Sequence, residues 1–263
     1  MIYFVGAGSG APDLITVRGA KLLGEADVIV YAGSLVNPAL LDYAKGDCAI
    51  YDSAKMTLEE VIAVMAPAAR EGKTVVRLHT GDPCVYGAHR EQMDALDARG
   101  VDYEVVPGVS SFCGAAAALR QEYTLPGISQ SVVITRLSGR TPMPAGEGMR
   151  TMAESGSTMV IFLSSGMLAE LSAELLAAGR SSDEPAALVY KATWPEERVV
   201  RCTVGTLADA GAREGIDRTA LVVVGRVLGA RGGLAHNGAQ AESYERSKLY
   251  DPSFATGYRK ASS

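Results

Sequence analysis

Short, strongly apolar runs alternate with longer segments of helical periodicity through the first half of the chain, and this alternation restricts the fold more than any other feature. The apolar runs cover residues 2–6, 26–32, 48–52, 74–79 and 102–106. The segments with helical patterns cover residues 16–25, 37–45, 57–72 and 88–100. Runs this apolar are typical of parallel strands that are covered on both faces. We therefore predict β-α units up to about residue 112, which form one doubly wound α/β domain.

The ends of these predicted helices carry local signals. Thr57 is a good N-cap, and Glu60, three residues further on, completes a capping box. Gly72 and Gly100 stand where helices commonly end, because glycine adopts the left-handed backbone conformation at little cost.

A second set of elements follows a helix start at 107–120 and a turn-rich segment at 121–131. Predicted strands cover 132–136, 158–163, 186–191, 198–204 and 220–228, and predicted helices cover 166–179 and 206–215. The short separation of 186–191 from 198–204 suggests an antiparallel pair and hence a mixed sheet. We predict two α/β domains, each around a largely parallel or mixed sheet. The N-terminal domain is expected at 1–113, a helix and linker at 114–130, the C-terminal domain at 131–230 and a polar tail at 231–263.

Charge and cysteine content narrow the functional classes. The 263 residues carry a formal net charge of −5 and no basic stripe with interleaved aromatic residues, which argues against a nucleic-acid partner. The cysteines, which are Cys48, Cys84, Cys113 and Cys202, are scattered without a C-x-x-C pair, as expected for reduced thiols. No apolar run approaches the ~20 residues of a membrane span, and the N-terminus lacks a signal-peptide pattern. We expect a soluble, cytoplasmic protein without a membrane partner.

The first predicted strand ends in the glycine-rich sequence VGAGSGA. Gly6, Gly8 and Ala11 satisfy the spacing of a dinucleotide-binding turn. The second strand, however, ends without the Asp or Glu that would bind a ribose hydroxyl, and Pro12 delays the helix that would bind a pyrophosphate. We therefore predict a tight glycine turn. An NAD-binding oxidoreductase remains the alternative from a different class.

The sequence HTGDP follows the fourth strand at its carboxyl end, where open α/β sheets bind their ligands. Gly81 permits a close backbone approach, Pro83 stiffens the turn, and Asp82 offers a carboxylate beside backbone amides. His79, Asp82 and His89 are metal-binding residue types, but they include no histidine pair at i,i+4 and no fourth donor. We predict no metal site.

The sequence VPGVSSFCGAAAALR places another glycine turn and two serines at a strand–helix junction. Ser110 or Ser111 is suited to cap the helix that follows. A nucleophilic serine is not predicted, because no G-x-S-x-G elbow is present. The small residues of GAAAA allow this helix to pack very close to a flat group or to another backbone.

Taken together, these three loops resemble those of the tetrapyrrole (class III) S-adenosylmethionine-dependent methyltransferases. The matching segments are VGAGSGAPDLITVRGAKLL, GDPCVYG and VPGVSSFCGAAAA, in that order. Further segments look most like the precorrin-4 C-11 methyltransferases of cobalamin biosynthesis, namely HTGDPCVYGA, TRLSGRTPMP, LVYKATWPEERVVRCTV and SKLYDPSFATGYR. The resemblance covers nearly the whole chain. One departure is Ser9, where many relatives carry proline.

The resemblance implies two α/β domains with the active site in the trough between them, and usually a homodimer. It implies S-adenosyl-L-methionine as methyl donor, S-adenosyl-L-homocysteine as product, and methylation of precorrin-4 at C-11 to give precorrin-5. Cobalt-precorrin-4 is the alternative substrate, and a non-catalytic tetrapyrrole carrier is a further alternative. The cofactor-binding residues carried over are Ser9, Thr80, Gly81, Asp82, Val85, Ser110, Ser111, Leu163, Ala192 and Ala220.

The predicted substrate is edged with carboxylates, so a chain of net negative charge must gather cations locally. Arg136 and Arg140, in the segment TRLSGRTPMP, and Lys191 are the candidates for substrate binding. Methyl transfer from a sulfonium needs mainly positioning, and no catalytic side chain is identified. Asp82 is the single residue that we expect to matter most.

Overall fold

The computed structural model describes residues 1–230, 244–245 and 247–261. The chain divides into two compact units, Met1–Ala115 with Lys191–Glu197 and Ala116–Tyr190 with Arg198–Ser263. Of the predicted polar tail, residues 231–243, 246 and 262–263 lie outside the described residues. A 3-10 helix, η6, spans Lys248–Tyr250 in the described part of that tail.

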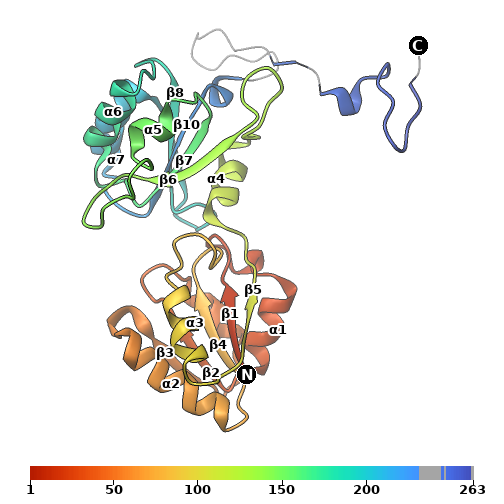
Figure 1. The fold of residues 1–263 in the computed structure, drawn as a ribbon, viewed down its shortest axis with the longest axis vertical. Coiled ribbons are helices and arrows are strands. Elements are labelled where there is room, and N and C mark those ends of the chain that lie inside the picture. Colours follow the sequence, from red (N-terminus) through yellow and green to blue (C-terminus); the bar gives the residue numbers. More distant parts are fainter. Residues whose placement is uncertain (231–243, 246, 262–263) are drawn as a thin grey trace. The chain divides into compact units, whose positions relative to one another are not determined.

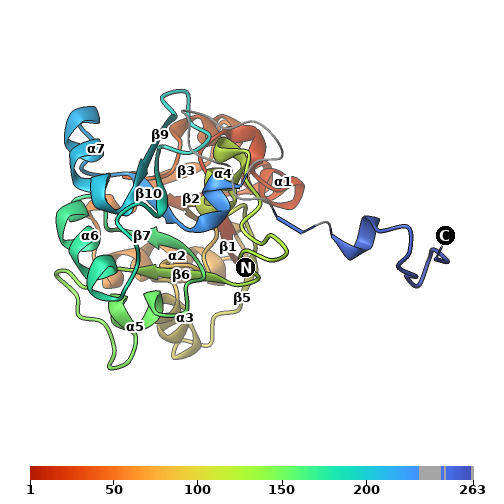
Figure 2. The ribbon, with the colours of Figure 1, turned by 90° about the horizontal axis from the view of Figure 1, so that it is seen from above.

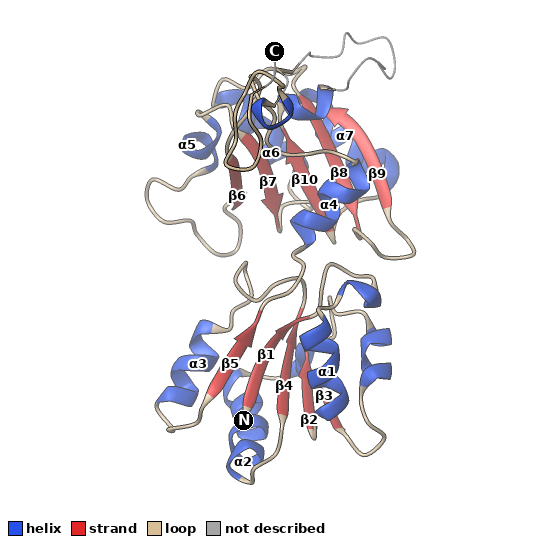
Figure 3. Ribbon diagram, turned by 90° about the vertical axis from the view of Figure 1, so that its right-hand side faces the viewer, coloured by secondary structure: helices blue, strands red, loops and turns tan. Residues whose placement is uncertain are grey.

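The first unit is built on a five-stranded parallel sheet with the order β3-β2-β4-β1-β5 (Figures 1 and 3). The strands are β1 (Ile2–Gly6), β2 (Val28–Tyr31), β3 (Ala49–Asp52), β4 (Val75–His79) and β5 (Tyr103–Val106). Strand β1 aligns its last residue, Gly6, with His79 of the central strand β4. All the strands predicted in the first half of the sequence are confirmed.

Helices cover both faces of this sheet, as the apolar runs predicted. Helices α2 (Leu58–Arg70) and α3 (Arg90–Asp97) pack against one face, where Phe4, Val30 and Val75 lie in the core. Helix α1 (Val17–Glu25) and the 3-10 helices η1 (Pro12–Leu14), η2 (Pro38–Tyr43) and η3 (Ser53–Lys55) complete the unit. Val76 and Leu78 lie in the core of the opposite face, with Leu23 of α1 and Leu40 of η2. Alternate residues of β4 therefore point to opposite cores.

The local helix signals are confirmed in part. The Thr57 amide donates to Glu60 Oε2 at 2.7 Å, and the Glu60 amide donates to Thr57 Oγ1 at 3.3 Å, so the capping box forms. The segment predicted as a helix at 37–45 is a 3-10 helix. The bonds that close it run from residue i to i−3, as from the Leu40 amide to the Asn37 carbonyl at 3.1 Å.

The second unit contains a five-stranded mixed sheet with the order β6-β7-β10-β8-β9 (Figures 1 and 3). The strands are β6 (Val132–Arg136), β7 (Thr158–Phe162), β8 (Pro185–Tyr190), β9 (Arg198–Thr203) and β10 (Ala220–Val224). Strands β6 and β7 are parallel, and β10 pairs antiparallel with both β7 and β8. Strands β8 and β9 are also antiparallel, so the mixed sheet predicted from their short separation is confirmed.

One face of the second sheet packs on helices α5 (Met149–Ala153), α6 (Leu168–Ala177) and α7 (Leu207–Glu214), with the 3-10 helix η4 (Val204–Thr206) between β9 and α7. Figure 2 shows the three α-helices along one side of the strands. Helix α5 was not predicted, because its five residues are too few to show a period. The prediction of strand over 220–228 was wrong beyond Val224. There Gly225, at φ 155°, donates its amide to Pro185 at 3.0 Å, and the chain continues as the 3-10 helix η5 (Arg226–Gly229).

Helix α4 (Ser111–Leu119) passes from the first unit into the second, which begins at Ala116. Within the second unit, Arg201 of β9 donates from Nη2 to the carbonyl of Leu119 at 3.0 Å. The last turn of α4 is thereby bound to the second sheet.

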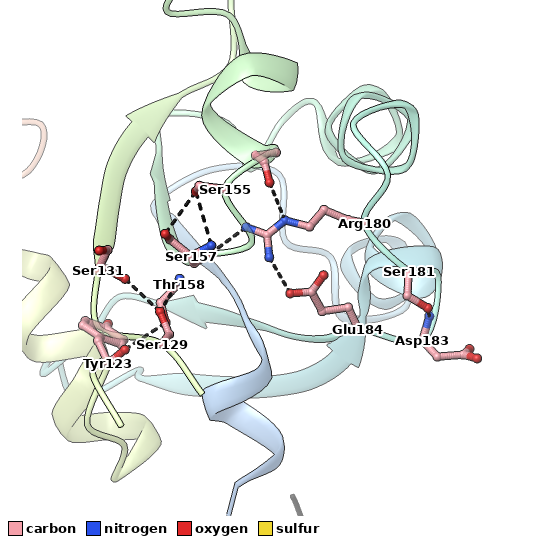
Figure 4. Close-up of polar contacts among 11 residues, drawn as sticks. Tyr123, Ser129, Ser131, Ser155, Ser157, Thr158, Arg180, Ser181, Asp183 and Glu184 are labelled. Atoms are coloured by element: carbon pink, nitrogen blue, oxygen red, sulfur yellow. Dashed lines mark hydrogen bonds and ion pairs between the residues drawn. The ribbon is translucent and has the colours of Figure 1, made fainter. Parts of the chain in front are cut away.

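A buried ion pair joins several segments of the second unit (Figure 4). Arg180, just beyond α6, donates from Nη1 to Glu184 Oε1 at 2.6 Å, and the two side chains are only 5% and 8% exposed. The same guanidinium donates from Nε to the carbonyl of Ala153 at 2.9 Å and from Nη2 to that of Ser157 at 2.6 Å. Arg180 thus fixes the end of α5 and the start of β7 against the start of β8.

Replacing Glu184 with glutamine should destabilise the protein by about 3–5 kcal/mol, because the guanidinium of Arg180 then stays buried without a counter-charge. Urea denaturation followed by circular dichroism measures the loss. The matched control is Glu170→Gln, at an exposed position of α6, which should change stability by at most about 0.5 kcal/mol. Equal stability of Glu184→Gln and the control would contradict the structural role assigned to the pair.

Candidate functional site

The loops that follow β1 and β4 are bound to each other through their backbones. The amide of Gly8 donates to the carbonyl of Gly81 at 3.2 Å, and the amide of Gly81 donates to the carbonyl of Gly8 at 2.9 Å. The amide of Ala7 donates to the carbonyl of His79 at 2.7 Å. The two glycine turns predicted from the sequence therefore meet at the carboxyl edge of the first sheet.

The loop that follows β5 packs against the same place. A side-chain carbon at Gly6 would lie 2.5 Å from Cα of Gly108 and 2.7 Å from the carbonyl oxygen of Gly81. A side-chain carbon at Gly108 would collide with that same oxygen. Only glycine fits at both positions. Backbone atoms therefore line this edge of the sheet. A site that binds a ligand through amides and carbonyls requires such a lining.

Asp82 links the second of these loops to the third. Its Oδ1 accepts from the Cys84 amide at 2.8 Å, and its Oδ2 accepts from the Gly108 amide at 2.7 Å. Burial by itself would raise the pKa of Asp82, but the hydrogen bonds from Cys84 and Gly108 outweigh burial and bring this pKa below its ordinary value. The carboxylate is therefore ionised at neutral pH while it holds the two loops together.

The other predicted cofactor residues of these loops lie around Gly81. A side-chain carbon there would be 3.4 Å from the amide nitrogen of Ser111 and 3.9 Å from the hydroxyl of Ser110. Ser110 is buried, and its carbonyl accepts from the Gly114 amide at 3.3 Å as α4 begins. Thr80 donates its hydroxyl to the carbonyl of Leu35 at 3.3 Å. The half-buried Val85 completes the turn, with its amide 3.4 Å from the carbonyl of Asp82.

The remaining predicted cofactor residues belong to other segments. Ala192 is buried within the first unit. Ala220 is buried at the start of β10 in the second unit. Leu163 directly follows β7, has a φ of 52° and is 63% exposed. A leucine in the left-handed region is uncommon.

Sequence reasoning missed the part that Thr193 and Trp194 take in the first glycine loop. The Ser9 and Thr193 hydroxyl oxygens lie 3.1 Å apart, and the Ala11 amide donates to Thr193 Oγ1 at 3.0 Å. Trp194 lies where a side chain at Gly10 would be. The segment KATWPEE stood out as a family motif, but no local pattern indicates which part of the chain it contacts.

The three cationic side chains that were predicted to bind the substrate differ in their surroundings. Arg136 donates to the carbonyls of Leu137, Thr141 and Pro142 at 3.0–3.3 Å, so it organises the loop after β6. Lys191 is half-buried, 3.4 Å from Glu196 and 5.2 Å from the ring centre of Trp194. Arg140 is exposed. Within the described residues, no hydrogen bond or ion pair engages its guanidinium.

His79 lies buried beneath the loops. Its Nε2 has no hydrogen-bond partner among the described residues, and its ring stacks on Phe4 with centroids 5.9 Å apart. Burial, helped by the charges of Arg77 and His89, lowers the pKa of His79 to about 3. Arg77 is buried too, and burial lowers its pKa to about 10, so this side chain stays charged at neutral pH.

The His79 and His89 ring centroids lie 5.9 Å apart, and both rings contact Phe4. In the described part of the chain, no group of three or more His, Cys, Asp or Glu side chains is arranged to hold a metal ion. Within the same residues, no helix has the length and apolar character needed to cross a membrane.

The chain thus combines a parallel sheet edged by glycine loops with a mixed sheet, and its family follows from comparison with known proteins. Residues 1–208 match the family described as Tetrapyrrole (Corrin/Porphyrin) Methylases, and the chain belongs to it. The cobalt-precorrin-4 C(11)-methyltransferase of Methanocaldococcus jannaschii is 49% identical over 260 residues, covering 99% of this chain and 96% of the relative. A precorrin-4 C(11)-methyltransferase of a Sinorhizobium species is 44% identical over 259 residues, covering 98% of each. The family predicted from the loops is confirmed.

Solved structures agree with this assignment. The X-ray structure of a cobalamin biosynthetic enzyme, a cobalt precorrin-4 methyltransferase, matches with a TM-score of 0.85 and 48% identity over 86% of this chain and 95% of the other. The uroporphyrin-III C-methyltransferase of Thermus thermophilus complexed with S-adenyl homocysteine matches with a TM-score of 0.73 and 29% identity over 89% and 96%. The predicted fold class is confirmed.

The burial of His79 makes stability depend on pH. The unfolded chain takes up a proton on this histidine as the pH falls through about 6.5, whereas the folded protein resists protonation down to about pH 3. Acid therefore favours unfolding, and this residue should remove about 2 kcal/mol of stability between pH 6.5 and 5. Urea denaturation of the wild type and of His79→Phe at both pH values measures the effect. Between pH 6.5 and 5, His79→Phe should lose about 2 kcal/mol less stability than the wild type. Equal losses in the two proteins would contradict the role assigned to the burial of His79.

Proposed function

We propose that this protein transfers a methyl group from S-adenosyl-L-methionine to C-11 of precorrin-4 and gives precorrin-5 in cobalamin biosynthesis. The same transfer to cobalt-precorrin-4 is the alternative, because relatives of both names match the chain almost end to end. The structural observation that carries the proposal is the backbone-lined edge at Gly6, Gly81 and Gly108, beside the ionised Asp82. A relative that matches over 89% of this chain was solved with S-adenyl homocysteine bound.

The residues around Gly81 fit such a cofactor chemically. Asp82 supplies negative charge for a cationic ligand, and Thr80, Ser110 and Ser111 supply hydroxyl groups. The glycines let the three loops pack backbone against backbone, which holds these side chains close together. We propose that these residues bind the cofactor, together with Ser9, Val85, Leu163, Ala192 and Ala220.

When bound, S-adenosylmethionine supplies an electrophilic methyl group on a positively charged sulfur. The task left to the chain is then positional, because the methyl carbon and the accepting ring carbon must be held in line about 3–3.5 Å apart. Exclusion of water helps as well, since the positive charge is lost during transfer. Asp82 and the loops that it joins provide the rigid support for this positioning.

Arg140 is the best suited of the three predicted substrate-binding residues. Its guanidinium is exposed, whereas Arg136 is occupied with loop carbonyls and Lys191 is paired with Glu196. A guanidinium can grip a carboxylate with two parallel hydrogen bonds. We propose that Arg140 contacts the substrate carboxylates and that Arg136 holds the loop that presents it.

The proposal extends to assembly and location. We propose a homodimer that works in the cytoplasm, in line with the family resemblance and the absence of a membrane-spanning helix from the described residues. The mass in solution, measured by light scattering, tests the dimer, and cell fractionation tests the location.

Asp82→Asn should weaken the binding of S-adenosylhomocysteine at least about tenfold. The amide keeps one acceptor oxygen and puts an NH₂ group against a backbone amide, so one of the two loop bonds is lost. Isothermal titration calorimetry measures the affinity. The matched control is Asp183→Asn, at an exposed carboxylate of the second unit, which should bind like the wild type. An unchanged affinity of Asp82→Asn would overturn the role given to this carboxylate.

The proposed reaction is tested by offering the purified protein and S-adenosylmethionine with cobalt-free precorrin-4 and, separately, with cobalt-precorrin-4. We expect a mass gain of one methyl group, located at C-11 by nuclear magnetic resonance. Gain with the cobalt-free ring supports the first substrate, and gain with the cobalt complex alone supports the alternative. Tight cofactor binding without methylation of either ring would refute the proposed substrate and leave the family assignment standing.

A further inference from the structure

A segment from far along the chain completes the first glycine loop. Lys191–Glu197 belongs to the first unit, although the chain reaches it from β8 and leaves it for β9. Its Thr193 hydroxyl lies 3.1 Å from the Ser9 hydroxyl and accepts from the Ala11 amide at 3.0 Å. Ser9 is buried, with 7% of its surface exposed. A single hydroxyl therefore contacts a side chain and a backbone amide of the same loop.

The packing around this contact leaves no free space. A side-chain carbon at Gly10 would collide with the indole of Trp194. A side-chain carbon at Gly114 of α4 would lie 2.9 Å from Cβ of Ser9 and 3.1 Å from Cγ2 of Thr193. Glycine is thus required on both sides of the Ser9–Thr193 pair. The pair connects the first glycine loop to the helix that follows the third.

The segment itself is held in a conformation that most residues avoid. Lys191 has a φ of 46° and Thr193 a φ of 68°, and a β-branched residue such as threonine rarely adopts this left-handed region. The Thr193 amide donates to Glu197 Oε2 at 2.6 Å, and the Trp194 amide donates to the Lys191 carbonyl at 3.0 Å. Strain of this kind persists where the surroundings fix it, and it concentrates at functional sites.

We infer that Thr193 is a positioning residue for cofactor binding, acting through Ser9 and the Ala11 amide. The loop that it holds contains Gly8 at φ 82° and Gly10 at φ 153°, which restrict the backbone little by themselves. Without the Thr193 hydroxyl, the loop loses its bonds at Ser9 and Ala11 and samples more conformations, so ordering it on binding costs more. This inference rests on the proposed function.

Thr193→Val removes the hydroxyl and keeps the shape of the side chain, and Thr193→Ser keeps the hydroxyl. We expect Thr193→Val to raise the dissociation constant of S-adenosylhomocysteine about tenfold and Thr193→Ser to stay within about twofold of the wild type. In the methyl-transfer assay, Thr193→Val should raise the KM for S-adenosylmethionine and leave kcat within about twofold. A merely destabilised protein would instead lose active fraction, which lowers kcat.

Thr158→Val is the matched control. Thr158 is buried in the second unit and donates its hydroxyl to the carbonyl of Tyr123 at 2.8 Å (Figure 4), so its loss has a similar structural cost but should not change cofactor affinity. Thr193→Ala, which removes the same hydroxyl and has no β-branch, carries the test if Thr193→Val does not fold. The effects of Ser9→Ala and Thr193→Val should be less than additive, because both remove the same contact.

The outcomes separate the inference from the proposed function. Weak binding by Thr193→Val with rescue by Thr193→Ser supports the inference. If the wild type binds S-adenosylhomocysteine and Thr193→Val binds it equally well, the inference alone is overturned. The same holds if Thr193→Ser binds it as weakly as Thr193→Val. If Thr193→Ala carries the test, wild-type affinity in that variant overturns the inference in the same way. A wild type that does not bind S-adenosylhomocysteine overturns the proposed function, and the inference with it.

Discussion

The close approach of backbone to backbone at the carboxyl edge of the first sheet is the constraint on which the site depends. The carbonyl of Gly81 accepts from the Gly8 amide and also lies against Gly6 and Gly108, so one oxygen marks the meeting point of all three loops. No side chain fits at Gly6 or Gly108. The parallel sheet makes this approach possible, because it ends β1, β4 and β5 side by side at one edge. Asp82 then fixes the arrangement by accepting from the Gly108 amide.

Much of the fold was predictable because its signals are local. Strands buried on both faces show as apolar runs, and the capping box of Thr57 and Glu60 needs only residues within one turn. The errors lie where a short apolar run does not decide the type of element. Pro38–Tyr43 is a 3-10 helix, and the run that begins at Ala220 leaves the sheet after Val224 and continues as the 3-10 helix η5. Apolar residues in runs this short suit a strand or a helix alike.

The candidate site was predictable to the extent that the sheet itself assembles it. The family resemblance assigned Gly81, Asp82, Ser110 and Ser111 to the cofactor, and the structure brings them together because the strands before their loops end at the same edge. The contact of Thr193 with Ser9 spans 184 positions and depends on a segment between two strands of the other unit. A contact between residues so far apart leaves no periodic pattern in the sequence. The role of Arg136 could not be predicted either, because its partners are the carbonyls of its own loop.

The charges at and beneath the glycine loops are of both signs. Arg77 and His79 lie on β4 beneath the loops, and at neutral pH Arg77 is positively charged whereas burial keeps His79 neutral. Asp82 stays ionised at the loops themselves, because the amides that it accepts from stabilise its charge. An anionic ring would be repelled by this carboxylate, whereas a sulfonium would be attracted to it. The carboxylates of a tetrapyrrole therefore require a different residue, and this is the role that we propose for the exposed guanidinium of Arg140 in the second unit.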